Sequence, residues 1–151
     1  MFASNHVITG AVIGSLVVNP VIAIPVAFCA HFVLDAFPHY GIGDHTSKKF
    51  LYTLSADAGL ALALIVVIFV LQPQNWLLII ACGVSCASPD LMWLPRWLVE
   101  LKGRKPKNMG PVRRFHSKVQ WAEREIWWGL TSEVAWFCLM IFVLANNLNF
   151  T

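Results

Sequence analysis

Long apolar runs separated by short polar connections dominate this sequence. The runs cover residues 2–18, 21–37, 50–71, 76–94 and 126–144. A helix needs about 17–25 residues to cross the hydrocarbon core of a bilayer. The pattern therefore predicts about five transmembrane helices.

The first two runs are short for transmembrane helices. Pro20 suits the start of a helix, whereas Pro25 lies inside the second run, where a missing N–H distorts a helix. The two runs therefore form either two short helices or a re-entrant helical hairpin, which a bilayer tolerates only where it is buried against protein. We expect an all-α integral membrane protein with a single domain over residues 1–151.

The composition agrees with this class. Of the 151 residues, 58% are hydrophobic and 13% are charged, which is far from the balance of a soluble domain. The cysteines lie inside apolar runs, where a free thiol packs as a small hydrophobic group. We therefore expect no structural disulfide.

The basic residues predict the orientation in the membrane. Lys48 and Lys49 follow the second run, and the other nine of the 11 lysines and arginines follow the fourth. Because basic connections stay on the cytoplasmic side, residues 38–49 and 95–125 are expected there. The N-terminus is then cytoplasmic and the C-terminus lies outside.

The basic connection over residues 95–125 divides into two parts. Residues 102–111 are rich in basic residues, glycine and proline and are predicted to be mobile. Residues 112–125 predict an interfacial helix with one apolar stripe, formed by Phe115, Val119, Ala122 and Ile126. Anionic lipid head groups are the expected partners. Nucleic acid is not expected, since membrane proximity already accounts for the charge, and the oligomeric state is left open.

Ionisable residues within and beside the apolar runs all fall at one level of this topology. Each helix delivers at least one to the cytoplasmic boundary: His6, His31, Asp35, His39, Asp57, Asp90, His116 and Glu133. A charge at mid-membrane costs roughly 2.5–3.5 kcal/mol on insertion scales, and less near the interface. Several carboxylates with only histidines nearby repel each other unless a positive charge lies among them. The pattern therefore predicts one or two divalent metal ions.

The stretch AHFVLDAFPHYG is the centre of this prediction. His31 and Asp35 are four residues apart and project from the same helix face. Pro38 disfavours helix at the preceding residue, so His39 can fold back over the pair. Imidazole and carboxylate together suit zinc, manganese or iron, of which zinc is preferred here.

Gly10 and Gly14 form a GxxxG motif, with His6 one turn earlier on the same face. Small residues at this spacing let two helix backbones approach closely. The motif predicts a tight helix contact beside the expected metal site.

Each polar residue also has a structural interpretation. Asp57 or Glu133 can pair with a lysine or arginine from a connection, and Asp90 can cap a broken helix. His6 and His116 can be ordinary interfacial histidines. Asp44 and His45 are expected in a solvated turn.

The residues also resemble a known family. The matching features are His6, AHFVLDAFPH, Asp57 in the next apolar run, SPD at residues 88–90 and RFHS at residues 114–117. Together they resemble the small membrane-bound metal-dependent hydrolases, inner-membrane-associated proteins of the LexA-binding type. The resemblance covers about residues 4–120. It implies a multi-pass protein of the bacterial inner membrane, hydrolase activity and a metal centre at seven positions: His6, His31, Asp35, His39, Asp57, Asp90 and His116.

A local similarity points to the same chemistry. HFVLDAFPH is similar to the HFxxD…H element of zinc-dependent phospholipases C and single-strand nucleases, which cleave phosphate esters at a multi-zinc site. The rest of the chain does not follow that soluble fold, so the similarity is one of chemistry only.

We therefore expect a metal-dependent hydrolase that acts on a phosphoester or ester of an amphiphilic substrate at the cytoplasmic membrane boundary. Asp57, Glu133 and Asp90 are the candidate catalytic carboxylates, and one of the first two is the expected general base. Arg113 and Arg114 are candidates for holding a phosphate group. The alternatives are a metal-binding membrane scaffold without catalysis and a metal-ion transporter.

Overall fold

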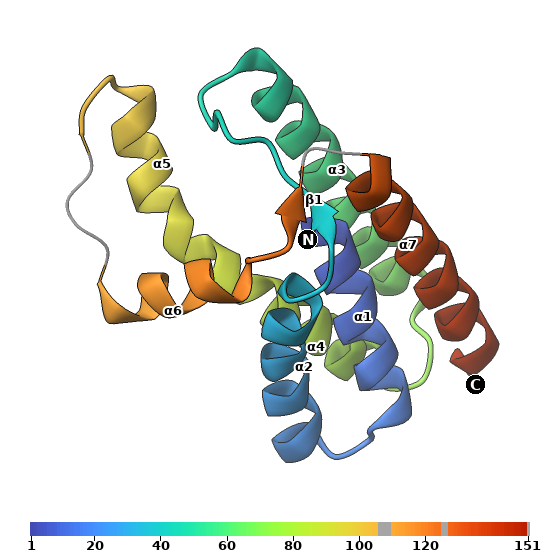
Figure 1. Ribbon diagram of the computed structural model, residues 1–151. Coiled ribbons are helices and arrows are strands. Elements are labelled where there is room, and N and C mark those ends of the chain that lie inside the picture. Colours follow the sequence, from blue (N-terminus) through green and yellow to red (C-terminus); the bar gives the residue numbers. More distant parts are fainter. Residues whose placement is uncertain (106–109, 125–126, 151) are drawn as a thin grey trace.

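The computed structural model describes residues 1–105, 110–124 and 127–150 of the chain, which form a helical bundle with one short strand pairing (Figure 1). The elements in chain order are α1 (Ala3–Leu16), α2 (Pro20–Asp35), β1 (His39–Tyr40), α3 (Lys48–Leu71), α4 (Trp76–Ala87), the 3-10 helix η1 (Ser88–Trp93), α5 (Leu94–Leu101), α6 (Pro111–Val119), β2 (Glu123–Arg124) and α7 (Trp127–Asn147).

Within the described parts of the chain, three helical stretches are long and apolar enough to cross a membrane: Lys48–Leu71, Trp76–Leu101 and Trp127–Asn147. Helix α2 is apolar but shorter. Along α3 only Ala61 and Ile68 are buried within the chain, so most of its apolar side chains face outward. An outward apolar surface of this extent suits lipid, and the predicted helical, membrane-spanning class is confirmed at this level.

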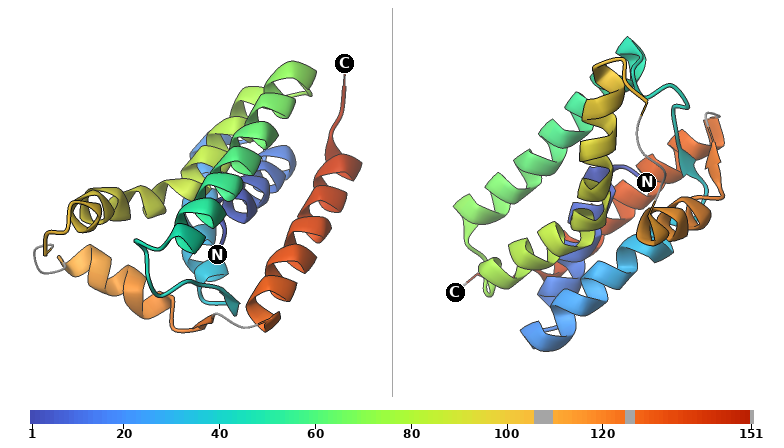
Figure 2. Two further views of the ribbon diagram at one scale, coloured as in Figure 1. Left: turned by 90° about the horizontal axis from the view of Figure 1, so that it is seen from above. Right: turned by 90° about the vertical axis from the view of Figure 1, so that its left-hand side faces the viewer.

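Helix α1 lies in the middle of the bundle and contacts α2, α3, α4 and α7 (Figures 1 and 2). Its residues 4–12 and Gly14 are buried. A Cβ atom on Gly14 would lie 2.8 Å from the Cα atom of Ile79, and one on Gly10 would clash with the carbonyl group of Cys82. The predicted close contact of small residues is therefore found between α1 and α4.

The fourth apolar run differs from its prediction. Helix α4 ends at Ala87, the chain continues as the 3-10 helix η1, and α5 extends to Leu101, well past residue 94. Pro89 lies at the start of η1 and has no N–H for the regular α-helical ladder. The break changes the direction of the chain and places Asp90 on η1, where α5 leaves the bundle (Figure 1).

The predicted helix over residues 112–125 is too long. Helix α6 ends at Val119, because β2 pairs in parallel with β1 and draws the chain away from the helix axis. Ala122 is buried in the intervening turn, so the predicted apolar stripe does not form as a helix face. Ile126 lies outside the described residues, as do residues 106–109 of the segment predicted to be mobile.

Substitution at Gly10 tests the α1–α4 contact. Gly10→Ala should destabilise the fold by about 1–3 kcal/mol, because the methyl group meets backbone atoms of α4 that cannot move freely. Gly59→Ala is the matched control, since a Cβ there has open space and alanine favours a helix by about 0.5–1 kcal/mol. Thermal unfolding in detergent measures both. Equal midpoints for the two variants would contradict the contact.

Candidate metal centre

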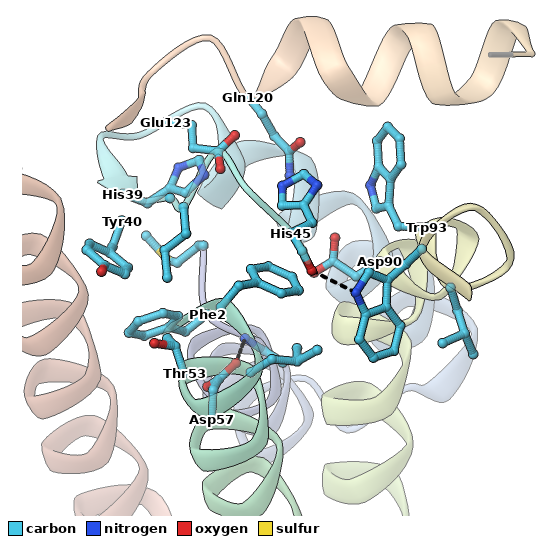
Figure 3. Close-up of a pocket in the computed structure, with 18 of the residues that line it drawn as sticks. Phe2, His39, Tyr40, His45, Thr53, Asp57, Asp90, Trp93, Gln120 and Glu123 are labelled. Atoms are coloured by element: carbon cyan, nitrogen blue, oxygen red, sulfur yellow. Dashed lines mark hydrogen bonds between the residues drawn. The ribbon is translucent and has the colours of Figure 1, made fainter. Parts of the chain in front are cut away.

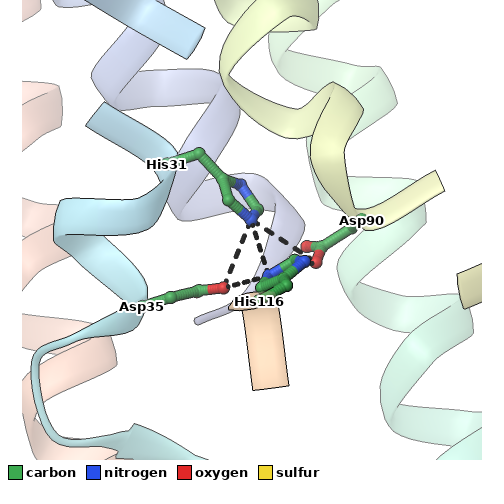
Figure 4. Close-up of side chains that lie close together, drawn as sticks. All are labelled: His31, Asp35, Asp90 and His116. Atoms are coloured by element: carbon green, nitrogen blue, oxygen red, sulfur yellow. Dashed lines mark hydrogen bonds and ion pairs between the residues drawn. The ribbon is translucent and has the colours of Figure 1, made fainter. Parts of the chain in front are cut away.

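Four side chains from three separate parts of the chain converge at one point. His31 and Asp35 come from α2, Asp90 comes from η1, and His116 comes from α6 (Figure 4). One potential ligand atom from each lies within 4.8 Å of all the others. The group could therefore hold a metal ion.

The spacing of these atoms can be compared with a metal coordination sphere. Ligand atoms about 2.0–2.1 Å from a tetrahedral zinc ion lie roughly 3.3 Å from each other. The Nε2 atoms of His31 and His116 are 3.0 Å apart, and Asp35 Oδ2 lies 3.2 and 2.8 Å from them. Asp90 Oδ1 lies 3.6 Å from both nitrogens. These five separations lie on both sides of the expected value, and no two of the four ligand atoms are more than 4.8 Å apart, so the group could close around an ion.

Neighbouring groups orient the candidate ligands. His31 Nδ1 lies 2.9 Å from the carbonyl oxygen of Cys86. Donation from Nδ1–H to that carbonyl leaves Nε2 as a lone-pair donor directed at the group. Gln120 donates from Nε2 to Asp35 Oδ2 at 3.0 Å. Such supporting contacts are typical of metal sites, where they fix the ring tautomer and the carboxylate orientation.

The centre is closed on the protein side and open at Asp90. The side chains of His31, Asp35 and His116 are 0% exposed, whereas Asp90 is 32% exposed. A buried carboxylate is costly unless positive charge or hydrogen bonds surround it. A bound cation would stabilise the buried Asp35 carboxylate, and the exposed part of Asp90 leaves one side of the centre accessible.

A cavity of about 570 Å³ adjoins the open side (Figure 3). Asp90 and Gln120 lie in its wall, so the cavity reaches both the candidate ligand and the residue that holds Asp35. Five aromatic side chains also line the cavity, namely Phe2, Tyr40, Phe50, Trp93 and Trp97, together with aliphatic and ionisable residues. The volume lies within the range of about 300–1,000 Å³ that is usual for ligand pockets.

His6 lies directly beside the group. Its ring stacks on that of His31 with centroids 4.1 Å apart, and its Nε2 lies 3.2 Å from Asp35 Oδ1. His6 is thus brought to the predicted centre, at its edge.

Asp57 and Glu133 lie at the N-terminus of α1. Asp57 accepts hydrogen bonds from the backbone N–H groups of Ala3 and Ser4 at 2.7 and 3.0 Å. Glu133 accepts from the backbone N–H of Phe2 at 3.1 Å and from Asn5 Nδ2 at 2.5 Å. The first N–H groups of a helix have no partner within the helix, and a carboxylate there also interacts favourably with the helix dipole. These contacts fix the end of α1 that carries His6.

His39 lies outside the four-residue group. It belongs to β1, which pairs with β2, and its Nδ1 lies 2.8 Å from the carbonyl oxygen of Phe37. Burial lowers the pKa of the His39 imidazole below its ordinary value, so the ring is neutral at neutral pH. His39 also lines the cavity that adjoins the centre, together with Asp90.

The two candidate phosphate-binding arginines lie on α6. Arg113 donates from Nε to the carbonyl oxygen of Met92 at 3.1 Å and so ties α6 to η1. Arg114 is exposed. Neither belongs to the wall of the cavity as far as the described residues define it.

Two contributing residues, Gln120 and Asn5, were not predicted from the sequence. Gln120 lies four residues after His116, and in a helix this spacing places two side chains on the same face. Asn5 donates to Glu133 from within an apolar run, where an amide is itself an unusual residue.

Comparison with known proteins gives no match: no family model matches the chain, and neither does a curated protein or a solved structure. The case for a function therefore depends on the geometry of the centre and of the adjoining cavity.

Two variants separate the metal centre from the anchor of α1. His31→Ala should remove most of the bound transition metal, because His31 Nε2 lies within 3.6 Å of three other candidate ligand atoms. Asp57→Ala should keep the metal but lower the stability by about 0.5–2 kcal/mol, as loss of a helix cap does. Elemental analysis and thermal unfolding of purified protein measure the two effects. Metal loss in Asp57→Ala with retention in His31→Ala would contradict the assignment.

Proposed function

We propose that the chain is a membrane-embedded, metal-dependent hydrolase that acts on a phosphoester or ester of an amphiphilic substrate. One observation carries the proposal: a buried group of side chains that could hold a metal ion is accessible through Asp90 from a cavity with several aromatic side chains in its wall. Catalytic sites keep a position for water or substrate, whereas purely structural sites are closed by protein. The proposal also agrees with the family resemblance noted from the sequence.

The donor set suits this chemistry. Two imidazoles and two carboxylates fit zinc, manganese or iron. Six-coordinate manganese or iron would keep positions for water and substrate beside these four ligands, and zinc would do so by expanding to five ligands or by releasing Asp90. A bound ion of this kind lowers the pKa of a coordinated water and polarises a phosphoryl or carbonyl oxygen.

The residues of the chain supply orientation and shape. The carbonyl group of Cys86 fixes the ring of His31, and Gln120 holds Asp35. Asp90, as the accessible carboxylate, is placed to accept a proton from an attacking water or to share in binding the ion. The aromatic wall excludes water from the reacting group and receives an apolar part of the substrate.

The position of the centre favours a substrate from the membrane. Asp90 lies within the candidate span Trp76–Leu101, and the cavity is bounded by residues of α3 as well, including Phe50 and Leu54. An amphiphile could thus reach the cavity with its polar end at Asp90. Phosphate esters are the preferred class, because metal ions stabilise both the attacking and the leaving oxygen.

We further propose that α1 and α2 enter the membrane as a short hairpin, so that the chain contributes about five helices to a bacterial inner membrane. The interior position of α1 supports this, since its polar residues are enclosed by other helices. The basic connections would then lie in the cytoplasm.

Turnover provides the test of the enzyme. Metal-loaded protein should hydrolyse at least one member of a panel of phospholipids, isoprenoid phosphates and carboxylic esters, tested with zinc, manganese and iron. Asp90→Asn should reduce turnover at least about 100-fold, the lower range for loss of an acid–base group, while expression and membrane insertion are unchanged. Asp44→Asn is the matched control, because Asp44 is exposed and bonds within its own turn. Metal-loaded protein that cleaves no substrate in the panel would favour the scaffold.

Site-specific labelling tests the orientation. In a background without native cysteines, Lys105→Cys should react with an impermeant maleimide only after the cytoplasmic side is exposed. Gln74→Cys, between α3 and α4, should react from the outside. Labelling of both positions from the same side would exclude the proposed topology.

A further inference from the structure

His6 has an unusual environment for a buried histidine. Its side chain is 0% exposed, and among the described residues neither ring nitrogen makes a contact with hydrogen-bond geometry. An unsatisfied buried polar group costs about 1–3 kcal/mol. The Nε2 atom of His6 nevertheless lies 3.2 Å from Asp35 Oδ1 and 3.9 Å from Asp90 Oδ2. A fully buried imidazole that faces two carboxylates without a well-formed hydrogen bond points to a missing ligand.

The two oxygens of the Asp35 carboxylate contact different histidines. Its Oδ2 faces His31 and His116, at 3.2 and 2.8 Å from their Nε2 atoms. Its Oδ1 instead faces His6 Nε2, at 3.2 Å. One carboxylate thus lies between two sets of imidazole nitrogens.

The two carboxylate oxygens of Asp90 likewise face different histidines. Its Oδ1 lies 3.6 Å from the Nε2 atoms of both His31 and His116, whereas its Oδ2 lies 3.9 Å from His6 Nε2. Two carboxylates with this arrangement present one oxygen each to either side. This is the pattern of carboxylates that bridge a pair of metal ions.

We propose a second metal position beside His6, with Asp35 Oδ1 and Asp90 Oδ2 as shared ligands. The inference rests on the proposed function, since the first position is the group of His31, Asp35, Asp90 and His116. The ligand class is a divalent transition ion, zinc or manganese, because imidazole and carboxylate are the donors. Paired catalytic ions lie about 3.5–4 Å apart, a separation that a shared carboxylate spans.

The interaction at Asp35 Oδ1 shows that this side attracts positive charge. The amino nitrogen of Met1 lies 2.7 Å from that oxygen. A divalent ion would displace this ammonium group and gain His6 as well. The accessible side of Asp90 leaves remaining positions for water and substrate.

Metal stoichiometry and electron paramagnetic resonance test the pair. Detergent-purified full chain is depleted of metal with a chelator and reloaded with Mn²⁺. Wild-type protein should bind two manganese ions per chain and give the spectrum of a magnetically coupled pair. His6→Ala should lose about half of the manganese and give the spectrum of an isolated ion. His45→Ala is the matched control, because His45 is an exposed histidine outside the centre, and it should behave as wild type.

The outcomes separate this inference from the proposed function. A single, uncoupled ion in wild-type protein, with His6→Ala unchanged, would overturn the second position and leave the first intact. Protein that binds no manganese or zinc would overturn both. His6→Gln repeats the experiment with a side chain of similar size, so that a folding defect in the alanine variant cannot imitate loss of a ligand. The spectrum of the wild-type protein tests for a coupled pair of ions even if a variant fails to fold.

Discussion

The buried carboxylate of Asp35 is the interaction on which the rest of the structure depends. It is 0% exposed, and it contacts groups from α1, α6 and the turn after α6. A charge in such a place is stable only where compensating groups surround it. The segments that contact Asp35 are far apart in the sequence. The need to compensate its charge therefore holds these distant segments together. A metal ion would satisfy the carboxylate and the imidazoles together.

The second constraint is the position of α1. Glycines at residues 10 and 14 let α1 approach α4 closely, and Asp57 and Glu133 bind its N-terminal N–H groups. Together these contacts fix the position of α1 along its axis and its rotation about that axis within the bundle. His6 lies one turn into α1, so its place beside Asp35 follows from this anchoring. Asp57 and Glu133, which the sequence suggests for catalysis, thus hold the N-terminus of α1 in place in the structure.

The sequence was informative where physical rules are local. Apolar runs predicted the long helices, and the i, i+4 spacing placed His31 and Asp35 together. The predicted topology put Asp90 and His116 at the same level, and the structure brings both to that pair. The parts that could not be predicted depend on long-range contacts. The pairing of β1 with β2 ends α6 early, and nothing local to α1 reveals that Asp57 binds its N-terminus.

X-ray absorption spectroscopy of zinc-loaded protein tests the central claim most directly, because it reports the atoms bound to the ion. The account predicts nitrogen and oxygen neighbours only, at about 2.0–2.2 Å, with the signature of imidazole. Cys82 and Cys86 are buried nearby, and Cys86 already contacts His31 through its carbonyl group. A sulfur neighbour at about 2.3 Å, or the absence of any imidazole signal, would contradict a centre built from histidine and aspartate.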